Sequence, residues 1–173
     1  MIQSFETQLR VSVRALSEIV APALSGADKH VIEQLHLVIA ALEFMRARLP
    51  VARRFQRAEL EAYLALAEEA AANFRQHRGS ECEPLLAAMV DGKAELESST
   101  SDAEDCQRLT RRLRELLTSL VSQSSTEAEA AGLQTLVLAR GGEMLGDARL
   151  WCLPLGFELD PAALPPRDWL ASE

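Results

Sequence analysis

Apolar residues recur at alternating spacings of three and four along most of the chain, and this periodicity restricts the fold more than any other feature. It is plainest in residues 28–49, where the repeat consists of Leu35, Val38, Leu42, Met45 and Leu49. That spacing places the side chains on one stripe of an α-helix. Leu37, Ile39 and Phe44 widen the stripe, so we expect this helix to be buried on more than one side.

The same periodicity predicts further helices, and short polar segments separate them. The expected ranges are about 2–24, 28–49, 56–78, a shorter helix from about 83, then 102–122 and 124–140. Long helices joined by loops of a few residues pack as antiparallel neighbours. The sequence therefore predicts an all-α protein: an up-and-down antiparallel helix bundle of about five or six helices with an extended, proline-containing C-terminal tail.

Capping and breaking residues set the expected helix ends. Asp28 suits a helix start, and Ser101-x-x-Glu104 and Ser124-x-x-Glu127 have the spacing of a capping box. Pro22 and Pro50 oppose continuation of the helices that precede them. Gly141-Gly142 is expected to end or bend the sixth helix.

The C-terminal segment departs from the helical pattern. Its apolar residues alternate, at Trp151, Leu153, Leu155, Phe157 and Leu159, and four prolines between 154 and 166 oppose a continuous helix. An extended apolar segment needs a surface to cover it. We therefore expect a single domain over residues 1–173, with a bundle at 1–145 and a tail at 146–173 that packs on its own bundle or on a partner's.

Charge and composition exclude several classes of function. The net charge is −8 and the pI is about 5.0, which disfavours a nucleic-acid binder because phosphates need a cationic surface. No apolar run is long enough to span a bilayer, and the N-terminus lacks the pattern of a signal peptide. We expect a cytoplasmic protein that binds no membrane. Its sixteen Arg against two Lys, with abundant Ala, are typical of a GC-rich bacterial genome.

One short motif raises the possibility of a metal site. Glu33-x-x-His36 places a carboxylate and an imidazole on one helix face, and di-metal bundles use that motif twice. The other histidines, His30 and His77, have no Glu three residues before them. The dinuclear pattern is therefore incomplete. A mononuclear site built from Glu33, His36 and a distant carboxylate stays open, and with it a metal-dependent enzyme.

An arginine cluster at residues 46–57 stands out against the acidic composition. It comprises Arg46, Arg48, Arg53, Arg54 and Arg57, with no acidic residue between them. Guanidinium groups bind phosphate and carboxylate in a bidentate manner, so an anionic ligand is one interpretation. The other is structural: cations complement a helix C-terminus, and the remaining arginines pair with Glu59 and Glu61.

No catalytic signature is present, because the sequence lacks a nucleophile elbow, a phosphate-binding loop, a dinucleotide fingerprint and HExxH. In length and helicity the chain resembles the helical bundle that closes acyl-coenzyme A dehydrogenases, but no residue pattern for flavin or a catalytic base accompanies the resemblance. The cofactor is unknown.

We expect a non-catalytic protein that acts by association, as a homodimer, because the second helix and the tail are so apolar. The alternative is a binding module for a small apolar or acyl/coenzyme-type anionic ligand within the bundle. A metal-dependent enzyme that uses Glu33 and His36 is the third hypothesis.

Overall fold

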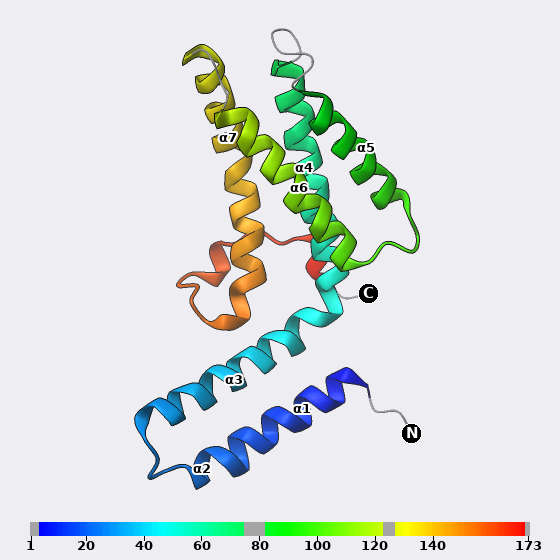
Figure 1. The fold of residues 1–173 in the computed structure, drawn as a ribbon. Coiled ribbons are helices and arrows are strands. Elements are labelled where there is room, and N and C mark those ends of the chain that lie inside the picture. Colours follow the sequence, from blue (N-terminus) through cyan, green and yellow to red (C-terminus); the bar gives the residue numbers. More distant parts are fainter. Residues whose placement is uncertain (1–3, 75–81, 123–126, 172–173) are drawn as a thin grey trace. The chain divides into compact units, whose positions relative to one another are not determined.

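The computed structural model describes residues 4–74, 82–122 and 127–171, and these residues are all-α, without a strand (Figure 1). They fall into two compact units. The hairpin unit comprises Met1–Val51 and Arg149–Ala163, and the bundle unit comprises Ala52–Ala148 and Leu164–Glu173. The expected single domain over 1–173 is not tested by this division and stays a prediction.

The hairpin unit is built on two antiparallel helical segments. The first comprises α1 (Phe5–Ala15), a π-helical turn (Leu16–Val20) and α2 (Ala21–Ala23), and the second is α3 (Lys29–Arg48). Asp28 begins α3 as expected, since its carboxylate accepts the backbone N–H of His30 at 2.9 Å. The helices predicted at 2–24 and 28–49 are therefore confirmed within a few residues.

The bundle unit contains α4 (Ala52–Phe74), α5 (Glu83–Glu97), α6 (Ala103–Ser122) and most of α7 (Glu127–Cys152). The first three follow one another up and down and pack closely together, whereas α7 packs less closely against them (Figure 1). Their 3-4 repeats supply the core. Its most deeply buried members include Leu60, Ala67, Leu85, Ala88, Cys106 and Leu113.

Gly92 lies in the middle of α5 and permits a close approach to α4. A Cβ added at Gly92 would lie 3.0 Å from Cδ2 of Leu64, and the glycine itself is buried. The helix continues through Gly92 to Glu97 without interruption. The glycine is therefore a packing residue within a continuous helix, because a Cβ at this position would require the side chain of Leu64 to shift by a few tenths of an ångström.

Two predicted helix signals act differently in the structure. Gly141-Gly142 does not end α7, which continues to Cys152 because the residues that follow favour a helix. Ser101 does not cap α6: its hydroxyl is buried 3.3 Å from Sγ of Cys106. Asp102 performs the capping, since its Oδ1 accepts the N–H groups of Glu104 and Asp105, each at 2.8 Å. The second capping box, at Ser124, lies outside the described residues.

The proline-containing tail forms short 3₁₀ turns, at Leu153–Leu155, Pro161–Ala163 and Asp168–Leu170. Trp151 was expected in the extended tail, but it lies in the last turn of α7. In the bundle unit Trp169 is buried, and its ring meets Phe55 edge-on with a centroid separation of 4.9 Å. This part of the tail therefore packs on α4 of its own chain.

Candidate functional site

The α3 seam is the heptad stripe on α3 and its end, formed by Val31, Leu35, Val38, Leu42, Met45 and Leu49. A spacing of four and three over six positions is the pattern of a coiled-coil interface. Leu35 and Leu42 are half-buried. The other four remain largely exposed, with 47% of Val31, 49% of Val38, 48% of Met45 and 56% of Leu49 accessible to solvent.

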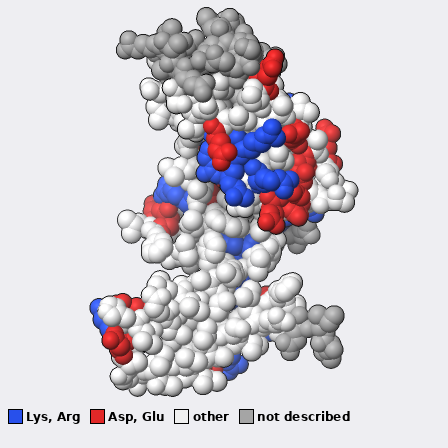
Figure 2. Space-filling model, in the orientation of Figure 1, with Lys and Arg blue, Asp and Glu red and all other residues white. Residues whose placement is uncertain are grey.

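The hairpin unit leaves this stripe uncovered because it has two long helical segments and little core. No residue of α1 is buried, and Arg48 is the single buried residue of α3. Residues 34–42 contain no charged Lys, Arg, Asp or Glu side chain. Figure 2 shows the consequence on one face, where few charged groups interrupt the surface of α1 and α3. An apolar helix surface of this extent is typical of an interface.

The five arginines of the predicted anion site divide between the units, and each has a partner within the chain. Arg46 pairs with Glu43 at 2.8 Å in the hairpin unit, where Arg48 also lies. In the bundle unit Arg53, Arg54 and Arg57 donate to the backbone carbonyls of Ser99, Ala171 and Leu96. Their role in binding an anion is not tested and stays a prediction.

Arg48 is the most buried of the five and caps the C-terminal turn of α7. Its Nη2 donates to the carbonyl of Leu150 at 2.6 Å, and its Nε donates to that of Trp151 at 2.7 Å. The carbonyls at a helix C-terminus lack partners within the helix and carry partial negative charge. Burial lowers the pKa of Arg48 from its usual value. The guanidinium keeps its charge, because the usual pKa of Arg lies far above neutral pH.

Glu33 and His36, the candidate metal ligands, are both exposed on α3. Glu33 lies 3.4 Å from Nζ of Lys29 and 3.6 Å from Nδ1 of His30. In the described ranges, no group of three or more His, Cys, Asp or Glu side chains is arranged to hold a metal ion. Cys82 and Cys106 are buried and Cys152 is exposed, and none forms a disulfide.

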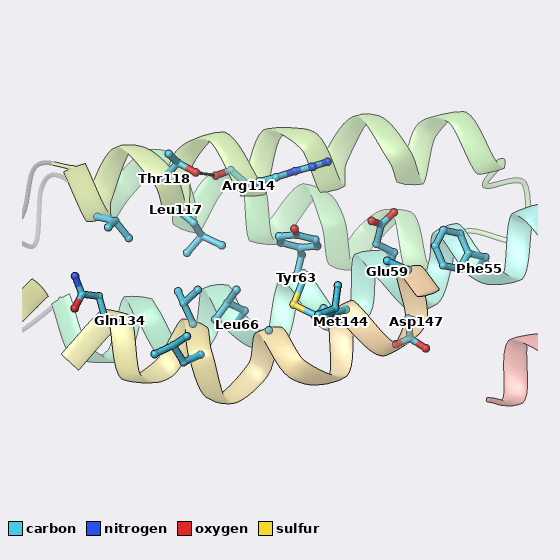
Figure 3. Close-up of a pocket in the computed structure, with 17 residues that line it drawn as sticks. Phe55, Glu59, Tyr63, Leu66, Arg114, Leu117, Thr118, Gln134, Met144 and Asp147 are labelled. Atoms are coloured by element: carbon cyan, nitrogen blue, oxygen red, sulfur yellow. Dashed lines mark hydrogen bonds between the residues drawn. The ribbon is translucent and has the colours of Figure 1, made fainter. Parts of the chain in front are cut away.

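A cleft of about 830 Å³ opens between α4, α6 and α7 in the bundle unit (Figure 3). It exists because α7 does not pack closely against α4 and α6. Apolar side chains form most of its wall: Phe55, Ala62, Leu66, Leu117, Val121, Val137, Leu138, Met144 and Leu145. This size falls within the range of small-molecule sites.

Glu59, Tyr63 and Arg114 form a polar group on the wall of the cleft, which we call the polar triad (Figure 3). The guanidinium of Arg114 lies 5.8 Å from the ring centroid of Tyr63, a cation–π contact. Burial raises the pKa of Glu59 above its ordinary value, and the charge of Arg114 partly opposes this rise. Burial also raises the pKa of Tyr63.

The polar triad has unused hydrogen-bonding capacity. Within the described part of the chain, the carboxylate of Glu59, the hydroxyl of Tyr63 and the guanidinium of Arg114 make no hydrogen bond. By contrast, Asp147 at the same cleft is occupied, because its Oδ1 accepts Nε of Arg167 at 2.7 Å and Nε1 of Trp169 at 3.2 Å. The triad can therefore supply one acceptor and two donors to a ligand.

Sequence reasoning did not find the cleft, because the triad residues are far apart in the chain and only the packing of α6 beside α4 joins them. Tyr63 of α4, the single tyrosine, is half-buried, and Arg114 of α6 is exposed. Met89 of α5 is buried in the core, and Met45 is exposed on the α3 seam. The methionine that lines the cleft is Met144.

A search against protein families found no match to this sequence, and searches of curated proteins and of solved structures found none either. Within the described residues, no helix combines the length and the apolar character needed to cross a bilayer.

Proposed function

We propose that the protein is a non-catalytic association module that forms a homodimer through the α3 seam. The observation that carries the proposal is the heptad repeat on α3, in which Val31, Val38, Met45 and Leu49 are about half exposed. A monomer has no use for an apolar a/d stripe in water, whereas a second helix converts it into an interdigitated interface. Two hairpins that meet along this stripe would form a four-helix arrangement.

The size of the hairpin suits such an interface. α3 has 20 residues, which corresponds to a length of about 30 Å, and a helix with its side chains is about 10 Å wide. Two helices side by side therefore present a face of about 600 Å² in projection. A stable interface of standard size buries about 800 Å² of accessible surface per partner. The face of one hairpin therefore corresponds to the lower end of the standard range, which is about 600 Å² per partner.

The charge pattern also favours a second copy over a charged partner. Residues 34–42 contain no Lys, Arg, Asp or Glu side chain, so complementarity rests mainly on apolar shape. Lys29 and Glu33 at one end of α3, and Glu43 and Arg46 at the other, already pair within the chain. An identical apolar stripe is the complementary surface that the chain itself provides.

Substitution of two exposed seam residues tests the proposal. The double change Val38→Glu and Met45→Glu introduces charge at positions that are 49% and 48% exposed, so the isolated hairpin tolerates it while a buried seam does not. Val90→Glu is the matched control, because Val90 is a helical residue of the bundle unit that is 68% exposed. Light scattering coupled to gel filtration gives the mass of each variant.

The expected result is a dimer for the unmodified protein and for Val90→Glu, and a folded monomer for the double variant. Circular dichroism checks that the double variant keeps its helix content. A double variant that remains dimeric would contradict the proposed interface, because the dimer would then form through a surface other than the α3 seam.

A further inference from the structure

The cleft between α4, α6 and α7 carries its ionisable side chains toward one end, the polar end, and mainly apolar side chains toward the other, the apolar end, where Thr118 and Gln134 are the polar exceptions (Figure 3). Glu59, Tyr63 and Arg114 lie toward the end where Phe55 and Asp147 close the wall (Figure 3). Leu117 lies toward the other end, with Gln134 beyond it (Figure 3). The lining of α7 runs from Gln134 to Ala148, a helical length of about 20 Å. The shape therefore suits an elongated molecule that is polar at one end.

The charges at the polar end restrict the head of that molecule. Glu59 and Arg114 carry opposite charges, and Asp147 is neutralised by its contact with Arg167 at 2.7 Å. An anionic head group would be attracted by Arg114 and repelled by Glu59. A cationic head group would be attracted by Glu59 and repelled by Arg114. A head without charge that both donates and accepts a hydrogen bond pairs with Glu59 on one side and with Tyr63 or Arg114 on the other.

We propose that the cleft binds a linear, uncharged amphiphile, with its alkyl chain along the apolar end and a hydroxyl or amide head at the polar triad. The cleft belongs to the bundle unit, so this inference is independent of the α3 seam and of the proposed dimer. The triad differs from the arginine cluster at 46–57, which was expected to bind an anionic head. The partly buried, unpaired carboxylate of Glu59 is the feature that sets the two sites apart.

Two neighbouring glycines provide a matched test of the cleft. Gly141 lines it, Gly142 does not, and an added Cβ meets nothing within 4 Å at either position. Gly141→Phe therefore fills the cleft without a backbone clash, and Gly142→Phe places the same ring outside it. Both changes replace a helical glycine, so their effects on helix stability are similar.

The reporter is N-phenyl-1-naphthylamine, an uncharged dye that fluoresces in apolar sites, and the competitors are 1-decanol, decanoate and decylammonium at neutral pH. We expect the dye to bind and 1-decanol to displace it at a concentration about tenfold lower than either charged competitor. Gly141→Phe should weaken dye binding about tenfold, and Gly142→Phe should leave it unchanged. Thermal unfolding by circular dichroism confirms that both variants are folded.

Changing the charge of the polar triad tests the position of the head. Glu59→Gln should improve the displacement by decanoate about tenfold, and Arg114→Gln should do the same for decylammonium, since each removes the opposing charge. Unchanged selectivity in both variants would show that the head does not lie at the triad.

Three other results would overturn the inference. No dye binding, or equal binding by the two glycine variants, would mean that the cleft holds no such ligand. Tightest binding of decanoate by the unmodified protein would mean that the site prefers an anion. Loss of an oligomer in Gly141→Phe alone, measured by light scattering, would mean that a second copy of the chain fills the cleft.

Discussion

Arg48 contacts Trp151 in two ways at once: Nε donates to the carbonyl oxygen of Trp151 at 2.7 Å, and the guanidinium carbon lies 5.7 Å from the centroid of its indole ring. Trp151 also meets Phe44 edge-on at a centroid separation of 5.9 Å. The C-terminal turn of α7 is thereby fixed to α3 inside the hairpin unit. Arg48, which the sequence indicated as a possible anion-binding residue, therefore has structural partners at the end of α7.

Arg48→Ala should destabilise the protein by about 3 kcal/mol, because it removes two hydrogen bonds from a charged donor to buried carbonyls. Arg48→Lys should recover only part of the loss, since an ammonium group lacks the planar fork that reaches the carbonyls of Leu150 and Trp151 together. Urea unfolding followed by tryptophan fluorescence measures both. Equal stability of Arg48→Ala and the unmodified protein would contradict the capping role.

Gly92→Ala and Gly142→Ala should shift stability in opposite directions. The added Cβ of Gly142→Ala meets nothing within 4 Å, so the helix gains about 0.5–1 kcal/mol from the change. The Cβ of Gly92→Ala would lie 3.0 Å from Cδ2 of Leu64, so α4 and α5 must separate or Leu64 must move. We expect a net loss of about 1 kcal/mol there, measured by thermal unfolding of the two variants in parallel.

Trp169→Ala should cost about 3–4 kcal/mol, because it removes a large buried side chain from the surface of α4. Trp169→Phe keeps an aromatic ring against Phe55 and loses the hydrogen bond to Asp147, so it should cost about 1 kcal/mol. Chemical denaturation distinguishes the two losses. A Trp169→Phe variant as unstable as Trp169→Ala would assign the main role to the indole N–H.

Glu59→Gln should make the stability of the protein less dependent on pH. Burial raises the pKa of Glu59 in the folded state, so folding favours its protonated form, and the ionised form destabilises the fold as the pH rises through that pKa. The facing groups are Arg114, which opposes the rise, and Tyr63.

At neutral pH Glu59→Gln should therefore be more stable than the unmodified protein, by less than about 1 kcal/mol because the carboxylate is partly solvated. The difference should disappear below the ordinary pKa of Glu, about 4.3. Thermal unfolding at several pH values measures it, and a gain that grows as the pH falls would have the wrong sign.

Helix positions were the most predictable part of this molecule, because they depend on local patterns. The repeat of Leu109 and Leu113 predicted α6, and Asp28 marked the start of α3 within one residue. Gly141-Gly142 does not end α7 because two glycines weaken a helix by a limited amount, and the residues around them offset this loss. The prediction that Ser101 caps α6 was wrong because the adjacent Asp102 is an equally good capping residue and occupies that position.

The candidate sites were less predictable, because they depend on which helices pack closely and which do not. The sequence around Glu59 and Arg114 does not indicate that α7 packs loosely against α4 and α6 and leaves a cleft beside these two residues. The α3 seam was visible in the sequence as a heptad repeat, but its exposure was not. That exposure follows from the small core of the hairpin unit, in which no residue of α1 is buried.

Native mass spectrometry of the unmodified protein, at several concentrations and without added ligand, tests the central claim most directly. The account predicts a species with twice the 19.0 kDa mass of the chain, which gives way to the single chain on dilution. A single chain at every concentration up to about 100 µM, where even a weak interface is populated, would contradict the proposal that this protein acts as a dimer through α3.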